Sequence, residues 1–303
     1  MMPSSIVKQL GIKNTFYLVN GLKEYFEDKR LVKKVLKETN FVFFNSDLEY
    51  QQIINDIDND EEALKLLKYS MACAMNSFNS YIEDDELVVV AEQTKIISPT
   101  INDLNNIDWM DAFIHELFHS IKSYENKLFD IQDGFVLRSG LLYTYYYPVQ
   151  NENGKIVLDN VRKGRGLEEY FNELQTEEFL KNYIYGNLDL TRDFACCDYY
   201  APLFNNNNFR AYLIDAQLYG KKEEFIDNFN KLTSSAYNEF EKLADRLYEE
   251  KCLINPNDDF SLYFKKYEDI NKYFFQPIYE EYFRKEKENA GNCRSRNSKK
   301  NFK

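Results

Sequence analysis

Apolar positions recur at helical spacing between residues 104 and 124. Trp109, Phe113, Leu117 and Ile121 follow one another at steps of four residues, and Ile114 and Phe118 widen the stripe. A stripe of this width is typical of a helix that buries one face in a core. The sequence therefore predicts a largely buried helix over residues 104–124.

Short apolar runs before this helix predict β-strands. Residues 41–44 are apolar and aromatic, and residues 86–91 are the clearest strand, with three consecutive valines. Residues 94–98 form a further run, which Pro99 ends because proline cannot donate to a ladder. Three strands are thus expected ahead of the helix.

After the helix, the pattern predicts a hairpin and a second helix. Two apolar runs flank Asn153-Gly154, a dipeptide that favours a tight hairpin turn, so we expect a hairpin over residues 134–161. Residues 167–182 then carry another helical stripe, which consists of Leu167, Tyr170, Phe171 and Leu174.

The remaining segments complete an α+β fold. Residues 1–40 and 47–80 have helical patterns, and so does most of the segment 187–284. We expect one α/β region over residues 1–186, followed by a helical lobe that either closes one side of a cleft or forms a separate interaction domain. The polar, basic residues 285–303 predict a disordered tail.

Composition narrows the classes of function. The chain has 303 residues, enough for one large domain or two small ones, and its net charge of −12 argues against nucleic-acid binding, which needs clustered Lys and Arg. Its five cysteines are odd in number and irregularly spaced, which predicts a reducing compartment rather than a disulfide framework. No run is long enough to span a membrane and no apolar leader is present, so cytoplasmic residence is expected; leaderless export stays open.

The only two histidines of the chain lie on the predicted helix 104–124, within the motif His115-Glu116-Leu-Phe-His119. One helical turn places both imidazoles on one face, where they can hold one Zn²⁺, and Glu116 beside them can take a proton from a metal-bound water. Two randomly placed histidines would give H-E-x-x-H in on the order of one chain in a thousand. The motif therefore predicts a site for one zinc ion per chain.

A catalytic zinc site usually has a third protein ligand, and no third histidine exists. The ligand must then be a carboxylate, a cysteine or something rarer. The best candidates are Glu169 and Glu173, which lie one turn apart on the predicted helix 167–182. One could bind zinc while the other holds a ligand histidine from behind.

These motifs resemble the gluzincin branch of zinc metallopeptidases. Residues 164–176, Gly-Arg-Gly-Leu-Glu-Glu-Tyr-Phe-Asn-Glu-Leu-Gln-Thr, are similar to a G-x-G-L-N-E-G-Y-T-E-L-x-T segment of poorly characterised bacterial and phage HExxH proteins. On that match Glu169 is the implied zinc ligand, and Glu173 the implied partner of a ligand histidine. The chain departs from the segment at residues 168 and 170–172, and a shifted register would make Glu173 the ligand. The resemblance covers roughly residues 85–180.

The resemblance implies a zincin-like fold, in which a small mixed sheet with an edge strand packs on the active-site helix. Lys95–Ser98 is the candidate for that edge, where an extended peptide could add; the alternative is an ordinary buried strand. It also implies hydrolysis of a peptide or protein substrate, with Glu116 as general base. The candidate donors to the oxyanion are Tyr143, Tyr145, Tyr146, Tyr147, Arg162, Arg165 and Tyr170.

Two alternatives to a peptidase follow from the same residues. The chain could be a non-catalytic binding or regulatory protein that a metal stabilises, although a structural site needs no general base such as Glu116. It could also be a metal-dependent hydrolase of a non-peptide amide. The sequence does not determine the oligomeric state.

Overall fold

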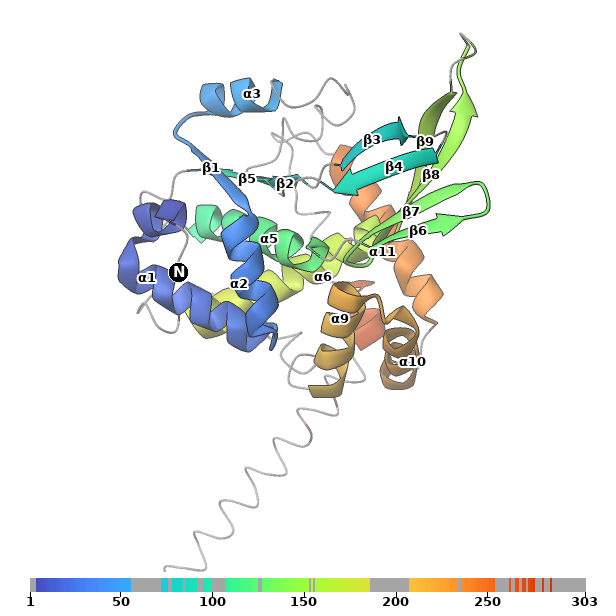
Figure 1. The fold of residues 1–303 in the computed structure, drawn as a ribbon. Helices are drawn as coiled ribbons and strands as arrows, with labels where there is room; N and C mark the ends of the chain where they lie inside the picture. Colours follow the sequence, from blue (N-terminus) through green and yellow to red (C-terminus); the bar gives the residue numbers. More distant parts are fainter. Residues whose placement is uncertain are drawn as a thin grey trace, which may run out of the picture.

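The computed structural model describes most of the chain and has an α+β fold (Figure 1). The described residues are 4–55, 72–75, 78–83, 86–91, 95–99, 107–124, 127–152, 154, 156–185, 207–233 and 236–253, with short pieces between 262 and 284. None of the helices within these ranges combines the length and the apolar character that crossing a membrane would require.

Two helices open the chain, as the pattern of residues 1–40 predicts. Helix α1 (Ser4–Tyr25) and helix α2 (Lys29–Glu38) meet at a sharp turn, where Asp28 caps α2 by accepting hydrogen bonds from the N–H groups of the next turn. Their buried faces join the core around the H-E-x-x-H helix, and Thr39 after α2 hydrogen-bonds to Ser120 on that helix.

A three-stranded mixed sheet lies over the H-E-x-x-H helix (Figure 1). Strand β5 (Lys95–Pro99) is its central strand, parallel to β1 (Asn40–Phe44) on one side and antiparallel to β2 (Cys73–Met75) on the other. Of the two alternatives for Lys95–Ser98, the edge strand is therefore wrong and the ordinary buried strand is confirmed, because both sides of β5 already have a partner. The strand beyond β5 in this sheet is β2.

Of the helix predicted for residues 47–80, the structure describes residues 47–55, 72–75 and 78–80; the span 56–71 lies outside the described residues. Helix α3 (Asp47–Asn55) begins as expected, but Cys73–Met75 and Phe78–Ser80 are strands. The segment has no Pro or Gly to signal a break, and its strand conformation comes from pairing with residues distant in sequence. Strand β3 (Phe78–Glu83) forms an antiparallel hairpin with β4 (Glu86–Ala91), which confirms the strand expected at 86–91.

A four-stranded antiparallel sheet follows the H-E-x-x-H helix, in the order β6-β7-β8-β9. Its strands are β6 (Lys127–Ile131), β7 (Gly134–Ser139), β8 (Leu142–Gln150) and β9 (Ile156–Lys163). The hairpin expected around Asn153-Gly154 is the β8–β9 pair. Its first apolar run, however, is two strands, since the chain turns at Gly140, whose positive φ suits the turn.

Two crossing helices form the centre of the molecule (Figure 1). Helix α5 (Ile107–Ser123) confirms the first predicted helix, and its residues Phe113, Ile114, Leu117, Phe118 and Ile121 are all fully buried. Helix α6 (Arg165–Phe179) confirms the second, and a π-helical segment η1 (Leu180–Tyr185) continues it. The contact between α5 and α6 brings the predicted ligands together.

The C-terminal half is helical in the described ranges: α9 (Asn207–Tyr219), α10 (Lys222–Thr233) and α11 (Tyr237–Leu253). Their aromatic side chains form a second core with the apolar face of α6. Helix α6, which precedes the predicted boundary at residues 186–187, thus shares a core with the helices that follow it. The tail 285–303 lies outside the described residues.

Candidate metal centre

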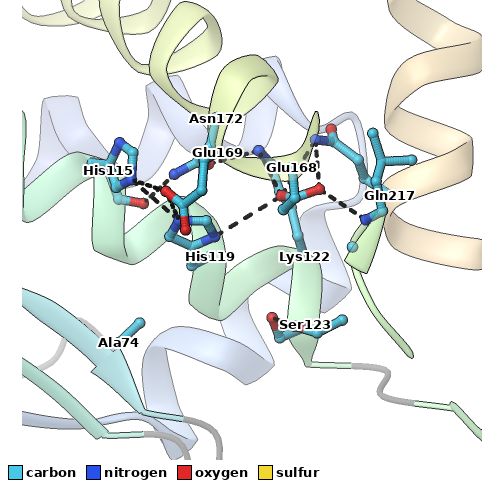
Figure 2. A network of polar contacts seen from close by, with 12 residues as sticks. Ala74, His115, His119, Lys122, Ser123, Glu168, Glu169, Asn172 and Gln217 are labelled. Atoms are coloured by element: carbon cyan, nitrogen blue, oxygen red, sulfur yellow. Dashed lines mark hydrogen bonds and ion pairs between the residues drawn. The ribbon is translucent and has the colours of Figure 1, made fainter. Parts of the chain in front are cut away.

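Three potential ligand atoms meet where α5 crosses α6 (Figure 2). The Nε2 atoms of His115 and His119 are 3.1 Å apart, and Oε2 of Glu169 lies 3.2 Å from the first and 3.4 Å from the second. The two imidazoles share one face of α5 because they are one turn apart. Among the residues that the structure describes, these three side chains form a group that could hold a metal ion.

The spacing of these atoms fits a small divalent cation. Two ligand atoms of a tetrahedral zinc ion with bonds of roughly 2.0–2.1 Å lie about 3.3 Å apart, close to all three sides of this triangle. Two nitrogens and one carboxylate oxygen also form a donor set that suits transition metals better than Mg²⁺ or Ca²⁺. The side chains of His115 and Glu169 are 20% and 26% exposed, so the site can be reached from solvent.

The charges within the group favour an anionic Glu169. Burial raises the pKa of Glu169, but the two imidazoles outweigh burial through their charge and hydrogen bonds, and its pKa falls well below the usual range. Burial lowers the pKa of His119, and the opposing effect of Glu169 leaves it raised. An ionised carboxylate facing two imidazoles is a suitable environment for a cation.

Glu116 lies beside the ligands and is held by the sheet. The backbone N–H of Ala74 in β2 donates to its Oε2 at 2.6 Å. Burial raises the pKa of Glu116, and the two neighbouring histidines oppose this effect. A carboxylate with a raised pKa, next to a metal site, has the properties of a general base.

A buried polar network lies on the other side of His119 (Figure 2). Nδ1 of His119 is 3.9 Å from Oε1 of Glu168. The same Oε1 lies 3.4 Å from Nζ of Lys122. Burial lowers the pKa of Lys122 to about 8, against the opposing effect of Glu168. Neither Lys122 nor Glu168 is among the predicted site residues, and the position of Lys122 one turn after His119 is the signal that could have identified it.

Glu173 lies elsewhere. Its Oε2 is 3.9 Å from Nζ of Lys251 on α11, and it does not belong to the group around His115. Of the two candidate third ligands, the structure brings Glu169 to the histidines.

The candidate oxyanion donors lie in different parts of the structure. Tyr146 stacks on Phe135, Tyr170 packs in the second core against Phe240, and Arg165 lies over the ring of Tyr248. Tyr248 on α11 was not among the candidates. Burial is the main cause of its raised pKa and the charge of Glu169 contributes, so Tyr248 lies within electrostatic reach of the centre.

In comparisons with known proteins, no protein family, curated protein or solved structure matches the chain. The functional conclusion therefore depends on the site itself.

Proposed function

We propose that this protein is a zinc-dependent metallopeptidase of the gluzincin type. The observation that carries the proposal is the triangle of His115 Nε2, His119 Nε2 and Glu169 Oε2, with Glu116 adjacent to it. A purely structural metal site would need the triangle but no neighbouring carboxylate with a raised pKa. Glu116 therefore favours a hydrolase over a metal-stabilised binding protein.

His115, His119 and Glu169 would hold Zn²⁺, which would supply the activation of a water as nucleophile. Glu116 would accept the proton of the attacking water and return it to the leaving amine. Burial raises the pKa of Glu116, which makes it a stronger base than an exposed carboxylate. Tyr248 and the other tyrosines and arginines are candidates for the donor to the oxyanion.

The position of β2 supports a peptide as substrate. Ala74 pairs with Ile96 of β5, and its N–H is directed to Glu116 rather than into the sheet. An extended peptide that adds alongside β2 would run past Glu116 and the metal ligands. A small non-peptide amide would gain nothing from this strand.

Replacement of Glu116 by Gln tests the catalytic role. The variant keeps its shape but cannot accept a proton, so zinc should stay bound while peptide hydrolysis falls by at least about 100-fold, the contribution typical of a general base. Hydrolysis is measured with a mixture of unstructured peptides by mass spectrometry. Undiminished cleavage by Glu116→Gln would show that Glu116 is not the base.

Metal analysis of the purified protein tests the site. The wild type should hold about one zinc per chain, Glu169→Ala should lose it, and Glu173→Ala should keep it. No bound zinc or other transition metal in the wild type, even after incubation with zinc, would overturn the proposal. A full zinc load without cleavage of any peptide would favour the binding-protein alternative.

A further inference from the structure

We propose that Lys122 and Glu168 form a buried ion pair that positions both ligand histidines before the metal binds. This inference rests on the proposed metal centre and deepens it. It assigns to Glu168 the supporting role that the resemblance implied for Glu173. Neither Lys122 nor Glu168 reaches the metal itself, so both act as positioning residues.

The first observation is the burial of the pair. The side chains of Lys122 and Glu168 are 0% and 5% exposed, and Nζ lies 3.4 Å from Oε1. Removing two charges from water costs several kcal/mol per ion, and the pair rarely recovers more than this cost. Stability alone therefore does not account for it, and an orienting role does.

The second observation is the position of Glu168 relative to His119. Nδ1 of His119 faces Glu168 at 3.9 Å, whereas its Nε2 faces Glu169 at 3.4 Å. The ring thus lies between two carboxylates. Glu168 favours the tautomer with the proton on Nδ1, which leaves the lone pair of Nε2 free for the metal.

Glu168 is fixed in this position from three directions. The N–H of Leu141 donates to its Oε2 at 2.8 Å, and Nε2 of Gln217 donates to both carboxylate oxygens at 3.3 and 3.4 Å. The backbone of Gly140 lies so close that an added Cβ would be 2.5 Å from Oε2. The carboxylate has little freedom to turn away from His119.

Lys122 also reaches the other histidine. It donates to Oδ1 of Asn172 at 2.6 Å, and Nδ2 of Asn172 donates to the backbone carbonyl of His115 at 2.9 Å. One lysine on α5 is therefore connected to both ligand histidines through two residues of α6, as Figure 2 shows. Loss of its charge should loosen both connections.

The test measures the affinity of the full chain for Zn²⁺ by competition with a chromophoric chelator, and the visible spectrum of the Co²⁺-loaded protein. Glu168→Gln should weaken zinc binding 10- to 100-fold, as is typical for partners of ligand histidines, and should change the Co²⁺ spectrum. Glu241→Gln is the matched control, since Glu241 pairs with Lys222 away from the site. It should leave both measurements unchanged.

Removing Glu168 alone leaves the buried charge of Lys122 without its partner, which can prevent folding. The double variant Lys122→Met/Glu168→Gln removes both charges and avoids this problem. It should fold, with a circular dichroism spectrum like that of the wild type, and should also bind zinc at least 10-fold more weakly. Folded Glu168→Gln or double variants with wild-type zinc affinity and Co²⁺ spectrum would overturn the inference.

These outcomes separate this inference from the proposed function. A wild type that binds no zinc or cobalt overturns both. A wild type that binds metal but cleaves no peptide overturns the peptidase alone, because the affinities of the variants still decide the role of the ion pair.

Discussion

His119 illustrates how much of the site depends on single atoms. Its two ring nitrogens face different carboxylates of the same helix turn, Glu168 and Glu169, which are adjacent in the chain. One carboxylate can share a metal with the ring, and the other can only orient it. The helical pattern alone does not distinguish the two glutamates, and only the resemblance of residues 164–176 favoured Glu169 as a ligand.

Asp28 gives a prediction at the same scale. Its carboxylate accepts hydrogen bonds from the N–H groups of Leu31 and Arg30 and from the hydroxyl of Tyr219. The Leu31 bond is the main cause that lowers the pKa of Asp28, and it outweighs the effect of burial. Asp28→Ala should reduce the free energy of unfolding by about 1 kcal/mol, the usual effect of removing an N-cap.

The sign of the pH dependence follows from the lowered pKa. The contribution of Asp28 is complete above its unfolded pKa of about 3.9 and is lost as the pH falls through the lower folded value. The difference between wild type and variant, measured by urea denaturation, should be constant between pH 5 and 7 and should shrink below about pH 4. Glu24→Ala, at an exposed position, is the control. A difference that grows on acidification would contradict this account.

At the scale of elements, the contact between α6 and α11 holds the helix that carries the candidate ligand Glu169. Asp245 on α11 accepts a hydrogen bond from the N–H of Gly166 at 2.8 Å, which holds the first turn of α6 in place. Glu169 follows within the next turn. The contact explains why a helix far along the chain affects the metal centre.

Gly166→Ala tests this contact. Alanine is normally better than glycine in a helix by about 1 kcal/mol. Here, however, its Cβ would lie 2.2 Å from the backbone oxygen of Ala244, so one helix must move. We expect a loss of stability of about 2 kcal/mol or more, as is typical of overpacking, together with weaker zinc binding.

Gly154→Ala is the comparison variant, because residue 154 lies in the distant β8–β9 turn. A Cβ added there would approach only the end of the Gln150 side chain, at 3.6 Å. The substitution should lower the free energy of unfolding by about 1 kcal/mol, because alanine is strained at the positive φ of residue 154. It should leave the zinc affinity unchanged. Thermal unfolding and chelator competition measure both effects. Equal zinc affinities in the two variants would show that the α6–α11 contact does not position Glu169.

At the scale of the whole molecule, the two cores share α6. Its residues Leu167, Tyr170, Phe171 and Leu174 belong to the C-terminal core, whereas Phe179 belongs to the core around α5. The helix that carries the third ligand thus connects both halves. The metal centre lies at this connection rather than within one half.

A chain that ends at residue 186 should therefore fail to fold around zinc. This fragment would expose the apolar face of α6. The free energy of unfolding falls by about 1.5–3 kcal/mol for each large apolar side chain that is no longer buried. Circular dichroism during heating, with and without zinc, compares this fragment with residues 1–284. Cooperative unfolding and tight zinc binding by the fragment would instead support a division into two domains at that point.

The sequence determined the local features of this protein. The H-E-x-x-H helix, the glutamate helix and the β8–β9 hairpin depend on spacing within a few residues, and the local pattern is sufficient to predict them. The absence of a third histidine left a carboxylate, a cysteine or a rarer group as third ligand, and the spacing on the second predicted helix favoured Glu169 and Glu173.

Only the tertiary structure decided which residues surround the ligands. Ala74 reaches Glu116 through a strand that has no strand signal of its own, and Gln217 reaches Glu168 from α9. Glu169 and Glu173 lie one turn apart on the same helix, and their surroundings differ because one faces α5 and the other faces α11. Such contacts join residues that are far apart in the chain. They depend on burial and packing in the folded protein, which the local spacing of residues does not encode.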